Sequence, residues 1–125
     1  MIYSYMQKQE NTEYKIGGQI WVQKNAENFM GPGRVALLEK LSEGCSISRA
    51  AESLGMDYTT AVKNIIAINK VADKPLVINH NDEHFEVTRY GNEIIKVYLQ
   101  LKEEHTVFLE KLNKTFEEKL TKIIL

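Results

Sequence analysis

The chain has 125 residues, of which 16 are Lys or Arg and 17 are Asp or Glu, so its formal net charge is −1. This length allows one domain with a modest core, and a composition of 43% hydrophobic and 26% charged residues excludes a disordered or fibrous chain. We also exclude a membrane helix and a secretory signal, and a single cysteine leaves no internal disulfide, so we expect a cytoplasmic protein.

Residues 1–18 are polar, with scattered tyrosines and no periodic pattern, and we interpret them as an N-terminal tail or arm. The β-branched and aromatic run Ile20–Gln23 then predicts the first strand of a short hairpin, which residues 24–28 turn back toward Phe29. We expect Trp21 and Phe29 to anchor this hairpin in the core.

Three short helices are predicted next. Pro32 suits the first helical position because its missing N–H needs no partner there, and this helix ends at Gly44. Ser46 is the expected N-cap of the second helix, which Gly55 ends. Asp57 is the expected N-cap of the third helix. The inward-facing positions are Val35, Leu37, Leu38 and Leu41 in the first helix, Ile47, Ala50, Ala51 and Leu54 in the second, and Ala61, Val62, Ile65 and Ile68 in the third.

Beyond Pro75 the sequence predicts a second hairpin and one long helix. The strands Leu76–Ile78 and Phe85–Val87 flank a polar tip of residues 79–84. From Thr88 onward no proline interrupts a helix that would reach about 50 Å at a rise of about 1.5 Å per residue. Apolar positions recur on this helix in a heptad-like pattern, and we expect this seam to form a homodimer interface. The seam consists of Ile94, Tyr98, Leu101, His105, Phe108 and Leu112.

The order hairpin, helix, helix, tight turn, helix, hairpin and long helix is typical of a winged helix-turn-helix. Ala50 and Ala51 are small enough for two helices to approach closely, and Gly55 tolerates the positive φ of a tight turn. We therefore predict a mainly α fold with small β hairpins (α+β). The winged helix-turn-helix domain would cover residues 19–91, and a C-terminal dimerisation helix would cover residues 92–125.

Several short motifs resemble the N-terminal domain of ModE-type molybdate-responsive regulators. These motifs are Ile20–Val22, Asn28–Arg34, Leu37–Glu39, the pattern Ser46-Ile47-Ser48-x-Ala50-Ala51-x-x-Leu54-Gly55-Met56-x-Tyr58, Asn69–Lys70, Lys74–Val77 and Thr88-x-x-Gly91. The resemblance implies a LysR-like winged helix-turn-helix that dimerises and binds operator DNA. After the long helix no residues remain for the family's ligand-binding domains, so molybdate is not expected as a ligand and no cofactor is implied. The wing tip is short and slightly acidic, whereas the family's wing is commonly longer, glycine-rich and basic.

The third predicted helix carries the residues that we expect to read DNA, because a helix-turn-helix places the N-terminal end of its second helix in the major groove. Their polar groups can donate to bases or phosphates. The predicted DNA-binding residues are Tyr58, Thr59, Thr60, Lys63 and Asn64 on this helix, together with Ser48, and with Arg34, Arg49 and Lys70 as candidate phosphate contacts. The alternatives are a merely solvated helix face and, for Arg49, a surface ion pair with Glu43 or Glu52.

Other reactive side chains give weaker signals. His80 and His84 straddle the second hairpin tip without a cysteine or third histidine nearby, so we predict no metal site. Cys45 is interpreted as a small packed residue rather than a redox switch, and His105 as an interface histidine rather than a pH sensor. The sequence contains no recognisable nucleophile–base pair or phosphate-cradling glycine loop, so we expect no enzyme.

We predict a sequence-specific transcriptional regulator that binds double-stranded operator DNA as a homodimer. The alternative is a protein-interaction module that has kept the winged scaffold but no longer engages DNA. The near-neutral charge and the acidic wing tip favour the alternative, because phosphate contacts supply much of the affinity for DNA.

Overall fold

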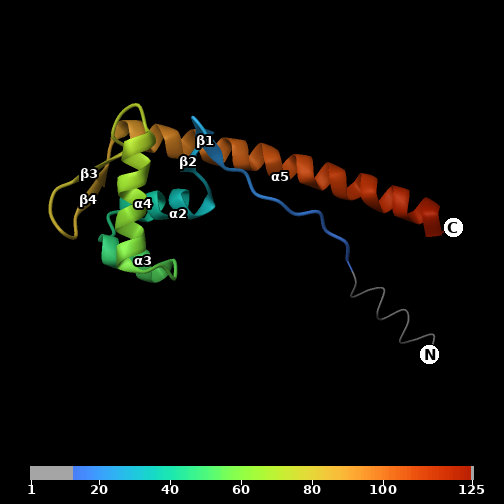
Figure 1. Cartoon of the computed structure of the whole chain (residues 1–125). Coiled ribbons are helices and arrows are strands. Elements are labelled where there is room, and N and C mark those ends of the chain that lie inside the picture. The colour runs from blue at the N-terminus through green and yellow to red at the C-terminus, as the bar shows by residue number, and fades with distance from the viewer. Residues whose placement is uncertain (1–12, 125) are drawn as a thin grey trace. The chain divides into compact units, whose positions relative to one another are not determined.

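The computed structural model describes residues 13–124, which form two compact units. The larger unit, Gln19–Lys102, contains β1 (Val22–Lys24), β2 (Glu27–Met30), α2 (Pro32–Ser42), α3 (Ile47–Ser53), α4 (Tyr58–Val71), β3 (Val77–Asn79), β4 (Phe85–Val87) and the first part of α5 (Arg89–Ile124). The smaller unit contains residues 13–18 and the remainder of α5. Figure 1 follows these elements along the chain. The expected fold class, mixed α and β with two small antiparallel hairpins and a long C-terminal helix, is confirmed.

The first hairpin is tighter than the sequence predicts. A two-residue turn joins the antiparallel strands β1 and β2, and both Asn25 (φ 52°) and Ala26 (φ 67°) adopt left-handed backbone conformations. Such a pair is characteristic of a type I′ turn, whose twist matches that of the strands. The expected longer turn through residues 24–28 is therefore wrong. Trp21 is 63% exposed, so its expected place in the core is also wrong, whereas Phe29 is half-buried against the core.

The ends of α2 and α3 lie where the sequence predicts them. Pro32 stands in the first turn of α2, after Gly31 as the N-cap, and Gly44 follows the helix with φ 95°. The Ser46 hydroxyl accepts a hydrogen bond from the Arg49 backbone N–H at 3.2 Å and so caps α3. These signals fix where each helix begins and ends.

The tight turn between α3 and α4 is made at Gly55, whose φ is 64°. Ala50 and Ala51 are buried, as expected for small residues where two helices of a helix-turn-helix pack closely. Asp57 occupies the N-cap position of α4, but its side chain makes no capping hydrogen bond. Small residues and a left-handed glycine thus set the approach of α4 to α3.

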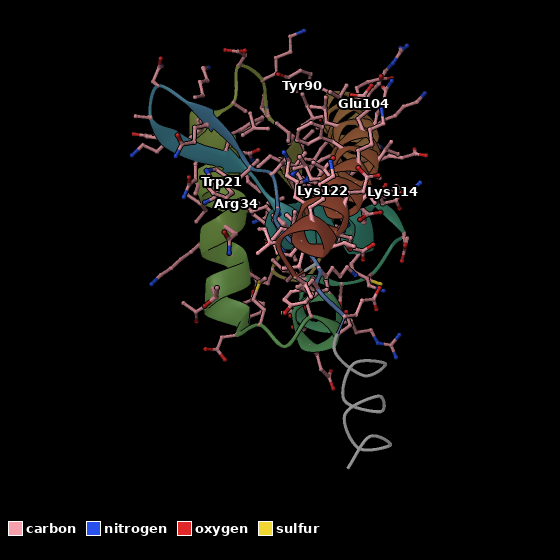
Figure 2. The ribbon with its side chains drawn as sticks, turned by 90° about the vertical axis from the view of Figure 1, so that its right-hand side faces the viewer. Trp21, Arg34, Tyr90, Glu104, Lys114 and Lys122 are labelled. Atoms are coloured by element: carbon pink, nitrogen blue, oxygen red, sulfur yellow. The ribbon has the colours of Figure 1, made fainter. Side chains whose placement is uncertain are left out.

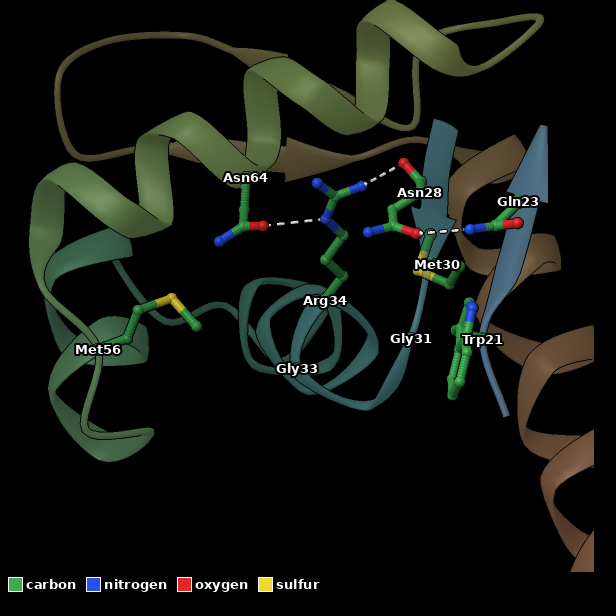
Figure 3. A pocket seen from close by; sticks show the side chains of 9 residues that line it. All are labelled: Trp21, Gln23, Asn28, Met30, Gly31, Gly33, Arg34, Met56 and Asn64. Carbon is green, nitrogen blue, oxygen red and sulfur yellow. Dashed lines mark hydrogen bonds between the residues drawn. The ribbon is translucent and has the colours of Figure 1, made fainter. Parts of the chain in front are cut away.

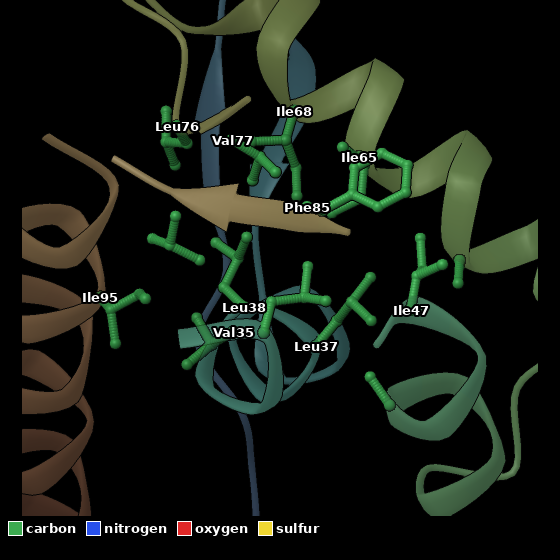
Figure 4. Close-up of a cluster of buried hydrophobic side chains, with 14 of the residues drawn as sticks. Val35, Leu37, Leu38, Ile47, Ile65, Ile68, Leu76, Val77, Phe85 and Ile95 are labelled. Atoms are coloured by element: carbon green, nitrogen blue, oxygen red, sulfur yellow. The ribbon is translucent and has the colours of Figure 1, made fainter. Parts of the chain in front are cut away.

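The larger unit has one hydrophobic core, to which β2, α2, α3, α4, the second hairpin and the start of α5 contribute (Figure 4). The largest fully buried side chains are Met30, Leu37, Leu38, Ile47, Ile68 and Leu76. Among the predicted inward positions, only Leu54 and Val62 are partly rather than fully buried. This core holds one face of α4 and leaves the opposite face exposed.

The second hairpin, formed by β3 and β4, is anchored on both sides. From α4, the Asn69 side chain accepts a hydrogen bond from the Leu76 N–H at 2.9 Å and donates one to the Val77 carbonyl oxygen at 2.8 Å. The Thr88 N–H donates to the Leu76 carbonyl oxygen at 2.8 Å, and its hydroxyl accepts from the Gly91 N–H at 3.0 Å. Thr88 therefore joins the hairpin to the first turn of α5.

In the smaller unit, residues 13–18 lie against the C-terminal part of α5 without regular secondary structure. The Ile16 N–H donates to the Asn113 side-chain oxygen, and the Tyr14 and Phe116 ring centroids are 5.5 Å apart. Polar side chains that include Glu104, Lys114 and Lys122 project from this part of the helix (Figure 2). Residues 1–12 of the predicted tail lie outside the described residues.

The residues of the predicted seam on α5 differ in how deeply they are buried. Tyr98 is 2% exposed and its hydroxyl donates to the Ile20 carbonyl oxygen at 2.8 Å, while Ile94 packs partly buried against the same core. Tyr98 therefore cannot face a dimer partner, and that prediction is wrong, because a heptad pattern does not distinguish packing within a chain from packing between chains. The remaining seam residues are the half-buried His105 and Leu112 and the exposed Leu101 and Phe108.

Candidate nucleic-acid interface

The exposed face of α4 is a continuous stripe formed by Thr59, Lys63, Ile66 and Lys70. Their spacing of four, three and four residues places them on one side of a helix with about 3.6 residues per turn. Ile66 is 61% exposed and was not among the predicted site residues. Its position within the polar stripe is the signal that identifies it, because its neighbour Ile65 already supplies the core contact.

One flank of this stripe is held by Arg34 of α2. The Arg34 Nε donates to the Asn64 Oδ1 at 2.9 Å, and its Nη1 donates to the carbonyl oxygens of Asn28 at 2.8 Å and Phe29 at 3.1 Å. The Asn64 side chain also donates to the Thr60 carbonyl oxygen at 3.0 Å. Partial burial lowers the pKa of Arg34 from its ordinary value. Two of the predicted DNA contacts, Arg34 and Asn64, thus form hydrogen bonds within the domain, and these bonds join β2 to α4.

A shallow hollow of about 550 Å³ lies beside this pair (Figure 3). It is lined by Trp21, Gln23, Asn28, Met30, Gly31, Gly33, Arg34, Met56 and Asn64. The Gln23 Nε2 donates to the Asn28 Oδ1 at 3.2 Å, so the amide groups on this wall are already paired with each other. The exposed indole of Trp21 therefore lies in the hollow beside polar side chains that bond to one another within the fold.

On the other flank, the tip of the second hairpin lies over the N-terminal ends of α3 and α4. The Ser48 hydroxyl donates to the Glu83 Oε1 at 2.7 Å, and the Ser48 N–H donates to the Oε2 at 3.3 Å. The Ile47 N–H donates to the Glu83 carbonyl oxygen at 3.1 Å. The Tyr58 hydroxyl donates to the Asp82 carbonyl oxygen at 2.9 Å. Two further predicted DNA contacts, Ser48 and Tyr58, are therefore occupied by the chain itself.

The remaining predicted contacts project outward. Thr59, Thr60, Lys63 and Lys70 are exposed on α4, and Arg49 is exposed on α3. Among the described residues, Arg49 forms no ion pair with Glu43 or Glu52, the two partners considered for it from the sequence. These side chains can therefore reach a ligand without first breaking a salt bridge.

The two wing histidines interact with each other and with a carboxylate. The His80 Nε2 lies 2.6 Å from the Glu86 Oε2, and the His80 and His84 rings stack with centroids 5.3 Å apart. Within residues 13–124, no three side chains of the metal-binding types come together to hold an ion. Cys45 is half-buried against the core.

The comparison with known families found no family model that matches this chain. The chain is 30% identical over 89 residues to the molybdenum transport protein ModE of Azotobacter vinelandii, an alignment that covers 68% of this chain and 33% of that protein. It is 29% identical over 83 residues to the transcriptional regulator ModE of Haemophilus influenzae, covering 62% of this chain and 32% of that protein. The chain spans about a third of the length of these relatives.

The resemblance to ModE is thus confirmed over about two thirds of this chain. One of these relatives is named a molybdenum transport protein and the other a transcriptional regulator. Among solved structures, the zinc-responsive MarR family member ZitR of Lactococcus lactis aligns with a TM-score of 0.44 and 17% identity, over 98% of this chain and 91% of that chain. No helix of residues 13–124 is both long and apolar enough to span a membrane.

Proposed function

We propose that this ModE-like chain is the DNA-binding part of a cytoplasmic transcriptional regulator, and that it binds operator DNA as a homodimer with α4 in the major groove. The observation that carries this proposal is the exposed stripe of α4, which combines Thr59, Lys63, Ile66 and Lys70 on a helix fixed by the core. One relative is named a transcriptional regulator, and the chain spans about a third of it. Because the chain matches only that part, we do not extend molybdate binding to it.

The stripe supports two kinds of DNA contact. Thr59 and Thr60 at the start of α4 and Lys63 one turn later can hydrogen-bond to base edges or phosphates. Ile66 offers an aliphatic surface that suits the C5-methyl group of thymine. Lys70, at the C-terminal end of the stripe, would contact the phosphate backbone.

The basic footprint of one chain is small, and a homodimer would double it. Two recognition helices about 34 Å apart would occupy successive major grooves on one face of an operator. The exposed Leu101 and Phe108 of α5 are the seam residues that remain free to pair with a second copy. We therefore assign the dimer contact to them and remove Tyr98 from it.

A salt titration of binding tests the proposal. Each phosphate contact that is lost should reduce the slope of log affinity against log salt by about 0.9. We expect Lys63→Ala to weaken binding and to reduce this slope. Lys96→Ala is the matched control, because Lys96 is an exposed lysine on α5, outside the proposed interface, and it should leave the slope unchanged. Equal slopes for both variants would contradict the assignment of α4.

The alternative function is a protein-interaction module on the same scaffold. It is favoured by the acidic wing tip, where the Glu83 carboxylate contacts Ser48 at the start of α3. The affinity for a protein partner would depend little on salt, whereas the affinity for duplex DNA would fall steeply as salt increases. The same titration therefore separates the two functions.

A further inference from the structure

We propose that the wing tip, residues 81–83, closes over the DNA-contacting surface when DNA is absent, and that Glu83 competes within the chain with a DNA phosphate for Ser48. This inference rests on the proposed function, together with the prediction from the sequence that Ser48 and Tyr58 contact DNA. It adds a step to that function, because DNA must displace the wing tip before it can reach these groups.

The contacts of the wing tip fall on residues of the predicted interface. The Glu83 carboxylate uses both oxygen atoms on Ser48, accepting from the hydroxyl at 2.7 Å and from the N–H at 3.3 Å. The Asp82 carbonyl oxygen accepts from the Tyr58 hydroxyl at 2.9 Å. The two contacts hold the N-terminal ends of α3 and α4 together under the same short loop.

The loop is preformed in the geometry that these contacts need. The Asn81 Oδ1 accepts from the Glu83 N–H at 3.0 Å and from the His84 N–H at 2.9 Å. The His80 N–H donates to the His84 carbonyl oxygen at 2.9 Å and closes the base of the loop. Because this bonding is local, the Glu83 side chain is presented toward Ser48 without help from a ligand.

A phosphate and the Glu83 carboxylate bind the same kind of hydrogen-bond donor. Each offers two oxygen acceptors and a negative charge, and the Ser48 hydroxyl and N–H can satisfy only one of them at a time. An approaching phosphate is also repelled by the carboxylate itself. Residues 75–91 contain Asp82, Glu83 and Glu86 and only Arg89 as a basic residue, so the closed wing provides little attraction in return.

The test compares two variants that remove the same charge from the same loop. Glu83→Gln removes the carboxylate that contacts Ser48, whereas Asp82→Asn leaves the contact in place, because Asp82 acts through its backbone oxygen. Affinity for duplex DNA is measured by fluorescence anisotropy for wild type and both variants. We expect Glu83→Gln to bind about three- to tenfold more tightly than Asp82→Asn, in line with the net contribution of one competing hydrogen bond. In a Ser48→Ala background this advantage should shrink, because the hydroxyl contact is lost while the contact from the backbone N–H remains.

The closed wing is also measured without DNA, by hydrogen exchange of the Ser48 amide. Glu83→Gln should accelerate this exchange, and Asp82→Asn should not. Equal affinities of the two variants for a duplex that wild type binds would overturn the competition while leaving the proposed function intact. If wild type binds no duplex but Glu83→Gln does, the competition is supported. If none of the three proteins binds any duplex, both the proposed function and the competition fail.

Discussion

Gly91 occupies the first turn of α5 where that helix passes the chain entering β3. A Cβ atom at this position would overlap the Leu76 carbonyl oxygen and lie 2.8 Å from the Val87 Cγ1. The requirement is steric, since Gly91 is not at a positive φ. The close approach explains why a poor helix former stands inside a helix at the junction with the wing.

Gly91→Ala should therefore destabilise the domain, by about 1–3 kcal/mol, because the added methyl group forces the backbone apart. Gly33→Ala is the control, because Gly33 also lies in the first turn of a helix but a Cβ there would meet nothing within 4 Å. Alanine at Gly33 should raise stability by up to about 1 kcal/mol through its higher helix propensity. Urea unfolding of both variants measures the difference, and a neutral Gly91→Ala would contradict the close approach.

Arg34 illustrates how a residue predicted to bind DNA can serve the fold. Its guanidinium group holds the end of β2 and Asn64 of α4 together. Arg34→Ala should lower the free energy of unfolding by about 1–3 kcal/mol, because hydrogen bonds to a partly buried charged group are lost. Lys63→Ala should leave the free energy of unfolding nearly unchanged. Thermal unfolding checks both, and an Arg34→Ala protein of wild-type stability would return Arg34 to the set of free phosphate contacts.

At the scale of elements, the residues with strong backbone preferences were the most informative in the sequence. Pro32, Ser46, Gly44 and Gly55 mark helix ends that the structure confirms. The tight first turn has no such signal in the sequence, because alanine has no preference for the positive φ that Ala26 adopts. Contacts between distant segments, such as Arg34 with Asn64 and Ser48 with Glu83, leave no local pattern and could not be predicted.

The positive φ of Ala26 in the first hairpin turn can be tested directly by substitution. Ala26→Gly should stabilise the domain by about 0.5–1 kcal/mol, because glycine adopts a positive φ without the penalty that alanine incurs. Ala36→Gly, in the middle of α2, is the control and should destabilise by about 1 kcal/mol. If chemical denaturation showed that both substitutions destabilise equally, the type I′ turn would be wrong.

At the scale of the whole molecule, operator binding by a homodimer requires that α5 pair two chains. The candidates are Leu101 and Phe108, which are 43% and 57% exposed. Leu101→Asp should shift the protein from dimer to monomer in sedimentation equilibrium, because a charge would then be buried in the interface. Gln100→Asp adds the same charge at the exposed adjacent position and should leave the dimer intact. A Leu101→Asp protein that is still dimeric would exclude this seam.

In the proposed function, the exposed face of α4 reads a DNA sequence. The most direct measurement is selection from a random duplex library with the purified protein, followed by a salt titration on the recovered site. We expect enrichment of a palindromic site, with binding that weakens steeply with salt and with Lys63→Ala. Recovery of no sequence, with only weak binding at low salt, would contradict it and favour the protein-interaction module.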